Sequence, residues 1–68
     1  MTDINKQIEF KIGDVVPYRN TRGNVKLVEI TSFETLENGN VWFNGIDIVT
    51  KAKVWYPAHI SKNLKQNQ

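Results

Sequence analysis

The sequence of 68 residues contains no cysteine and a single histidine, His59. Disulfide bonds and thiolate metal sites are therefore excluded, and a metal site built on histidines within one chain is not expected. A chain of this length forms one domain and buries only about 60% of the surface that its unfolded state exposes. We therefore expect a compact apolar core, with self-association as a further source of stability, and no cofactor.

Long apolar runs are also missing from the sequence. No segment reaches membrane-spanning length, and the opening "MTDINKQIEF" carries charges where a signal peptide has its apolar stretch. The absence of cysteine fits a reducing compartment. These features predict a cytoplasmic protein with no membrane partner.

Acidic residues are absent from the last third of the chain. No Asp or Glu follows Asp47, whereas four lysines do, and the net charge of the whole chain is +2. Such an asymmetry favours an anionic partner for the basic part, although surface lysines also keep a small domain soluble.

Alternating apolar and polar residues predict about five short strands with no long helix. The strand-like segments are 7–12, 15–18, 24–36, 41–50 and 54–56. We expect a flexible N-terminus over 1–6, a single β-barrel domain over 7–64 and a flexible tail over 65–68. The fold class is all-β.

Two strand segments contain irregular features. In 24–36, Val28 and Ile30 share one parity whereas Leu27 and Phe33 share the other, which predicts a bulge or a strong bend. In 41–50, the pair Asn44-Gly45 indicates either a tight turn or a bulge within one long strand.

Glycine and proline residues predict the positions of the turns and of the strand ends. Asn38-Gly39 predicts a hairpin with a type I′ turn, and Gly23 can take a positive φ in the preceding loop. Pro17 predicts that its segment lies at a sheet edge or leaves the sheet. Pro57 ends the last predicted strand and starts one helical turn, "PAHIS", from which Ile60 and then Leu64 pack back.

The order of these segments resembles a Src-homology-3-like barrel. The resemblance rests on "IGDVV", a polar loop, "GNVKLVEI", a hairpin and "WYPAHI", and covers residues 10–65. It implies a five-stranded small barrel with a short helical turn before the last strand. Modules of this fold bind nucleic acids or peptides, so the fold does not choose the function.

"GDVV" followed by "VWYPAHI" is also similar to the plasmid-borne type II dihydrofolate reductases. Those barrels form tetramers and bind substrate with a Gln-Ile-Tyr triplet before the proline. This chain has Val54-Trp55-Tyr56 instead, so only the tyrosine is kept and reductase activity is not expected.

Residues with the chemistry for catalysis are few. His59 is the one base that titrates near neutral pH, and its neighbours Ala58 and Ile60 indicate a surface or packing role. Asp14 is expected to bond backbone N–H groups in its turn. Asp47, between Ile46 and Ile48, is expected to face solvent from an alternating strand. With no phosphate-binding loop or dinucleotide motif, we expect a protein that is not an enzyme.

A binding surface is better supported, because basic and aromatic residues are interleaved. Alternation predicts that one of Trp42 and Phe43, and one of Trp55 and Tyr56, is in the core while the other is exposed. Arginines bind phosphates and exposed aromatics stack on bases. The candidate binding residues are Arg19, Arg22, Lys26, Trp42, Lys51, Lys53, Trp55 and Tyr56, and Tyr18 is a further candidate.

The leading hypothesis is therefore a small nucleic-acid-binding protein. The alternative is a protein–protein interaction module, since exposed Trp and Tyr are typical of interface hot spots and an open strand edge can pair with a second copy. An accessory or inhibitor protein of the kind that plasmids and phages encode is also compatible with the acidic centre of the chain.

Overall fold

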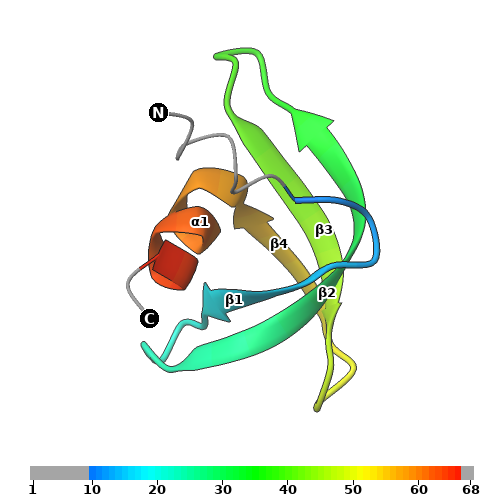
Figure 1. The fold of residues 1–68 in the computed structure, drawn as a ribbon, viewed down its shortest axis with the longest axis vertical. Coiled ribbons are helices and arrows are strands. Elements are labelled where there is room, and N and C mark those ends of the chain that lie inside the picture. Colours follow the sequence, from blue (N-terminus) through cyan, green and yellow to red (C-terminus); the bar gives the residue numbers. More distant parts are fainter. Residues whose placement is uncertain (1–9, 67–68) are drawn as a thin grey trace, which may run out of the picture.

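A computed structural model describes residues 10–66 as one curved antiparallel sheet followed by a helix. The strands pair in chain order, so β1 and β4 are the two edges of the sheet. The curvature brings β1 towards the helix that follows β4 (Figure 1). The elements are β1 (Val15–Arg19), β2 (Val25–Thr35), β3 (Val41–Asp47), β4 (Lys53–Pro57) and α1 (Ala58–Gln66). The prediction of a mostly β fold is confirmed.

The described residues contain four strands where five were predicted. The first predicted strand, 7–12, begins outside the described residues, and Phe10–Ile12 do not form a strand. Phe10 instead packs edge-on against the core residue Phe43, with ring centroids 6.3 Å apart. Of the two positions predicted for the Pro17 segment, an edge strand or a segment leaving the sheet, the structure shows the first, because among the described residues β1 has one neighbouring strand.

The helix is longer than predicted, and no strand follows it in the described part of the chain. It has nine residues and reaches Gln66, beyond the expected domain boundary at 64. Its anchors are Ala58 and Ser61, which are buried, and the Ser61 hydroxyl donates a hydrogen bond to the Pro17 carbonyl of β1. The expected anchor Ile60 is 39% exposed. The second half of the helix is polar, so the sequence did not predict it. Tertiary contacts of the helix with β1 stabilise it instead. α1 is also too short and too polar to cross a bilayer.

The predicted bulge is present in β2. The pairing of β2 with β3 shifts register between Ile30 and Ser32. Before the shift, Val28 and Ile30 face the core, and after it Phe33 lies opposite Phe43. One extra residue therefore lets Phe33 lie on the same side of the sheet as Val28 and Ile30, whereas Leu27 before the shift lies on the other side.

The hairpin between β2 and β3 lies where Asn38-Gly39 predicted it, but its turn is not type I′. Gly39 has φ 89°, and Asn38 does not have a positive φ. The Asn38 side chain instead accepts a hydrogen bond from the N–H of Asn40 at 3.0 Å. The turn therefore needs one left-handed residue instead of two.

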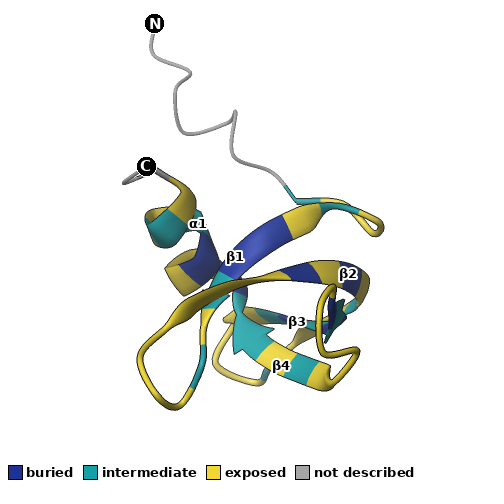
Figure 2. Cartoon of the chain, turned by 90° about the horizontal axis from the view of Figure 1, so that it is seen from below, coloured by how far each residue is buried: buried dark blue, intermediate teal, exposed yellow. Residues whose placement is uncertain are grey.

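The core is small and lies on the concave side of the sheet. It consists of Val16, Val28, Ile30, Phe43 and Ala58. Buried positions are concentrated on the strands and the start of α1, whereas the connecting turns are exposed (Figure 2).

Candidate functional site

Alternation separates the aromatic residues of β3 and β4 by face as predicted, although Trp42 and Tyr56 are both of intermediate burial. Phe43 is fully buried whereas its neighbour Trp42 is half-buried. In β4, Trp55 is 51% exposed, and Tyr56 packs against the core. One aromatic of each pair therefore points inward and the other lies on the convex face of the sheet.

The two tryptophans contact each other on that convex face. Trp42 lies opposite Pro57 and Trp55 opposite Asn44, so the indoles are diagonal neighbours across two strands. Their ring centroids are 4.1 Å apart and their planes are tilted by 31°. Trp42 thus supports one side of Trp55, while the rest of the Trp55 ring is open to solvent.

Two tyrosines bring the opposite edges of the sheet together. Tyr18 of β1 and Tyr56 of β4 meet edge to face, with ring centroids 5.8 Å apart. We call the line along which β1 and β4 approach each other the seam. A shallow groove of about 460 Å³ lies there. Its lining comes from the end of β1, the turn after it, Trp42 of β3 and all of β4; the side chains important below are Tyr18, Arg19, Trp42, Lys53, Trp55 and Tyr56.

Among the described residues, the groove lining is positively charged and includes no acidic side chain. Its two cations are Arg19 and Lys53. The Arg19 guanidinium donates one hydrogen bond to the Gly23 carbonyl at 2.9 Å, which holds the side chain in place while its other N–H groups can reach a ligand. Glu34 lies opposite Trp42 on β2 and sets an acidic boundary beyond the indole pair.

Asp47 was expected to face solvent, and that prediction was wrong. It is only 2% exposed, on the same side of β3 as Phe43 and Gly45. One carboxylate oxygen accepts hydrogen bonds from the N–H groups of Val49 and Thr50, at 2.8 and 2.9 Å. The other accepts one from the Tyr18 hydroxyl at 2.7 Å. Asp47 therefore holds the turn after β3 and fixes a groove tyrosine.

These contacts shift two pKa values in opposite directions. The pKa of Asp47 is lowered from 3.8 to about 2. The largest cause is the hydrogen bond from the N–H of Thr50, followed by the bonds from the Tyr18 hydroxyl and the N–H of Val49, while burial acts in the opposite direction. The pKa of Tyr18 is raised from 10.0 to about 12. The largest cause is burial away from solvent, followed by the hydrogen bond to the Asp47 carboxylate and the negative charge of that carboxylate.

The pKa of Asp47 predicts a loss of stability in acid. Because folding lowers this pKa, the ionised carboxylate stabilises the fold fully above pH 3.8, and that contribution disappears as the pH falls towards 2. We expect Asp47→Asn to flatten the fall in unfolding free energy across this window, measured by denaturant titration at a series of pH values. Tyr18→Phe is the matched control, since it keeps both backbone bonds and should keep part of the fall. An unchanged acid-side slope in Asp47→Asn would contradict the assignment.

The structure brings five of the eight candidate residues together and places three elsewhere. Arg19, Trp42, Lys53, Trp55 and Tyr56 line the groove. Arg22 lies exposed in the turn between β1 and β2 and is not part of the lining. The Lys51 ammonium donates to the Ile48 carbonyl at 3.1 Å, and Lys26 lines a separate hollow.

The residues considered for catalysis occupy unremarkable positions. His59 is exposed on α1, and Asp14 accepts a hydrogen bond from the N–H of Lys11 at 2.9 Å, as its predicted role in the turn requires. Within residues 10–66, no three acidic or histidine side chains gather closely enough to hold a metal ion.

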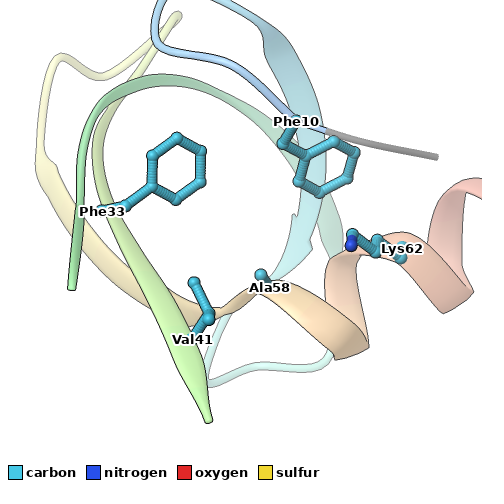
Figure 3. Close-up of a pocket in the computed structure, with 5 residues that line it drawn as sticks. All are labelled: Phe10, Phe33, Val41, Ala58 and Lys62. Carbon is cyan, nitrogen blue, oxygen red and sulfur yellow. The ribbon is translucent and has the colours of Figure 1, made fainter. Parts of the chain in front are cut away.

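A second hollow of about 270 Å³ lies where the curved strands open towards α1. Phe33 points into the space between the strands, and Lys62 lies beside Phe10 at the helix (Figure 3). Val41 and Ala58 complete an apolar lining whose single charge comes from Lys62. With only that one group to orient a ligand, this hollow is a weaker candidate than the groove.

Comparison with known proteins gives no relative from which a function could be transferred. No protein-family model, curated protein or solved structure matches the chain. Any function must therefore be argued from the groove itself.

Proposed function

We propose that the chain is a small, non-enzymatic protein that binds single-stranded nucleic acid in the groove between β1 and β4. The observation that carries the proposal is the lining of this groove, which within residues 10–66 combines an exposed indole, two tyrosines and two cations with no acid. Single-strand binding proteins combine these features, because every base has a face that stacks on an aromatic ring and every linkage carries a negative charge.

Each part of the groove has a role in this proposal. A base stacks on the open side of Trp55, which Trp42 supports from behind. Arg19 and Lys53 contact the flanking phosphates. Tyr18 and Tyr56 hold the two edges of the sheet at the spacing that the groove requires. Phosphate contacts of this kind give affinity with little sequence preference.

The proposal includes an architectural part, an incomplete Src-homology-3-like barrel. Its support is the bulged and strongly bent β2 and the contact of Tyr18 with Tyr56 across the seam. α1 covers β1 at the rest of the seam through the bond from Ser61 to Pro17. The groove is then the part of the seam that the helix leaves open.

Salt dependence tests the proposal through the two cations. For a single strand, the logarithm of the binding constant falls with the logarithm of salt concentration by about 0.7 for each phosphate neutralised. We expect Arg19→Ala and Lys53→Ala each to weaken binding of an oligonucleotide of about ten nucleotides and each to reduce that slope by about 0.7, measured by fluorescence anisotropy.

Arg22→Ala is the matched control, because Arg22 lies three positions from Arg19 and outside the groove. We expect it to change the slope much less than Arg19→Ala does. Equal effects of the two substitutions, or no binding at about 50 mM salt, would refute the proposed groove site.

A protein partner is the second candidate, favoured by the position of β4. β4 is a terminal strand of the sheet, and all of its residues line the groove. An extended peptide could add to this edge and place side chains against Trp55. Binding that persists undiminished at about 200 mM salt and requires a peptide would favour this function over nucleic acid.

A further inference from the structure

The turn between β1 and β2 adds a polar residue, Asn20, to the lining of the groove beside Tyr18. The N–H of Asn20 donates to the Asn24 carbonyl at 2.9 Å, so the pairing of the two strands continues past the pair formed by Arg19 and Val25. Alternation therefore extends to Asn20, which lies on the same side of β1 as Tyr18 and on the opposite side from Arg19. This half-buried residue is thus on the side of the groove where the two tyrosines meet.

Two hydrogen bonds fix the orientation of the Asn20 side-chain amide. Its oxygen accepts from the N–H of Arg22 at 3.0 Å and from the N–H of Asn24 at 2.9 Å. Because backbone N–H groups only donate, the oxygen of the amide and not its nitrogen must face them. These bonds occupy both lone pairs of the oxygen and leave the NH2 group on the other branch of the amide. The side chain of Asn20 therefore offers a ligand two donors and no acceptor.

The backbone of the same turn is held by further hydrogen bonds. The N–H of Gly23 donates to the Asn20 carbonyl at 2.9 Å, and the Arg19 guanidinium donates to the Gly23 carbonyl at the same distance. The Asn20 amide is therefore in position before a ligand arrives. A group that is already ordered loses little conformational entropy on binding, so more of its hydrogen-bond energy is available for selecting a ligand.

The other polar side chains of the groove lining either donate hydrogen bonds or adapt to the ligand. Arg19 and Lys53 are donors only, whereas the hydroxyls of Thr21 and Tyr56 can donate or accept. Within residues 10–66, no side chain of the lining is restricted to accepting hydrogen bonds. The side chains of the groove are therefore matched to a ligand edge that presents an acceptor.

We propose that Asn20 makes the groove prefer bases with a keto group, which are uracil, thymine and guanine, over bases with an amino group. The inference rests on the proposed function, and it adds the class of base to it. In a single strand the Watson–Crick edge of each base is open to contact. A keto oxygen on that edge accepts a hydrogen bond from the Asn20 amide, whereas an amino group would bring donor against donor and leave both unpaired.

Adenine is disfavoured for a second reason. The usual contact of asparagine with adenine is bidentate and uses the amide oxygen to accept from the amino group of the base. In this chain the turn already occupies that oxygen through the N–H groups of Arg22 and Asn24. Asn20 therefore reads a base through its NH2 group alone.

Uracil and cytosine test the preference with the unmodified chain, because they are pyrimidines of the same size that differ in the exocyclic group and in the proton on N3. We expect an oligodeoxyuridine of about ten nucleotides to bind about fivefold more tightly than the matching oligodeoxycytidine, measured by fluorescence anisotropy. Equal affinity, or tighter binding of the cytosine oligonucleotide, would overturn the keto preference and leave the groove site standing. If neither oligonucleotide binds, the proposed function fails and the inference fails with it.

Asn20→Asp tests whether this residue is the source of the preference. Aspartate keeps an acceptor for both N–H groups of the turn and replaces the NH2 donor with a second acceptor, so circular dichroism should show the same fold. We expect both oligonucleotides to bind more weakly because of the added negative charge, and the preference for uracil to disappear or reverse. Asn24→Asp is the matched control for charge, since Asn24 belongs to the same turn but not to the groove lining, and its preference should stay near fivefold. An Asn20→Asp variant that also keeps this preference would overturn the assignment to Asn20.

Discussion

Trp55→Ala is expected to weaken binding of single-stranded nucleic acid by about 5- to 150-fold. Stacking of one base on an aromatic side chain contributes about 1–3 kcal/mol, and Trp55 is the most exposed ring of the groove. The substitution should be tolerated by the fold, because the side chain is 51% exposed and lies outside the core. Fluorescence anisotropy of a labelled oligonucleotide gives the affinity, and circular dichroism checks the fold.

Trp55→Phe and Ile60→Ala are the controls for this experiment. Phenylalanine keeps an aromatic face, so Trp55→Phe should lose only part of the affinity. Ile60→Ala removes a partly exposed apolar side chain that is not part of the groove lining and should bind normally. Both tryptophans of the chain line the groove, so quenching of intrinsic fluorescence reports ligand there. Full affinity in a folded Trp55→Ala variant would remove the stacking contact from the proposal.

Gly45→Ala is expected to cost about 3 kcal/mol of unfolding free energy. A Cβ atom at this position would lie 2.5 Å from the Glu29 carbonyl oxygen and 2.6 Å from a methyl carbon of Val28. The oxygen belongs to the paired backbone of β2 and cannot move aside without disturbing the sheet. A domain of 68 residues has a total stability of only about 3–10 kcal/mol, so this substitution removes a large share of it.

The expected result is a midpoint of thermal unfolding about 10–25 °C lower than that of the unmodified chain. Asn44→Ala is the matched control in the neighbouring position of β3. It loses the 3.2 Å hydrogen bond from the Asn44 amide to Ser32 and should cost about 1 kcal/mol. A Gly45→Ala variant as stable as Asn44→Ala would mean that β2 and β3 can separate at little cost.

Local patterns predicted much of the sheet. Alternation predicted one core and one exposed residue in each of the pairs Trp42/Phe43 and Trp55/Tyr56 without choosing between them, and the change of parity between Ile30 and Phe33 predicted a bulge or a strong bend in β2. The choice between a turn and a strand at Asn44-Gly45 stayed open in the sequence. The structure shows a continuous strand, because β3 runs through both residues. Glycine is required at position 45 because β2 approaches it closely, and this long-range contact cannot be predicted from an Asn-Gly pair.

The wrong predictions for Asp47 and for the length of α1 have a common physical cause, because both features depend on tertiary contacts. The two isoleucines that flank Asp47 predicted a solvent-facing residue, but its hydrogen bonds with the Tyr18 hydroxyl and with the next turn make the buried position favourable. Its spacing from Val49 and Thr50 is the one local signal that could have indicated a turn-holding carboxylate. The length of α1 likewise depends on Ser61 reaching β1.

By itself, the sequence determined that neighbouring aromatics lie on opposite faces, the positions of the turns at Gly23 and Asn38-Gly39, and the excess of basic over acidic residues in the last third of the chain. These properties depend on neighbours within a few positions, whose period and φ preferences act locally. Only the tertiary structure decided that Arg19 belongs to the groove and Arg22 does not. That distinction depends on the approach of β1 to β4, where Tyr18 meets Tyr56 from the far end of the chain. The curvature of the whole sheet produces this contact, and no local stretch of the sequence encodes it.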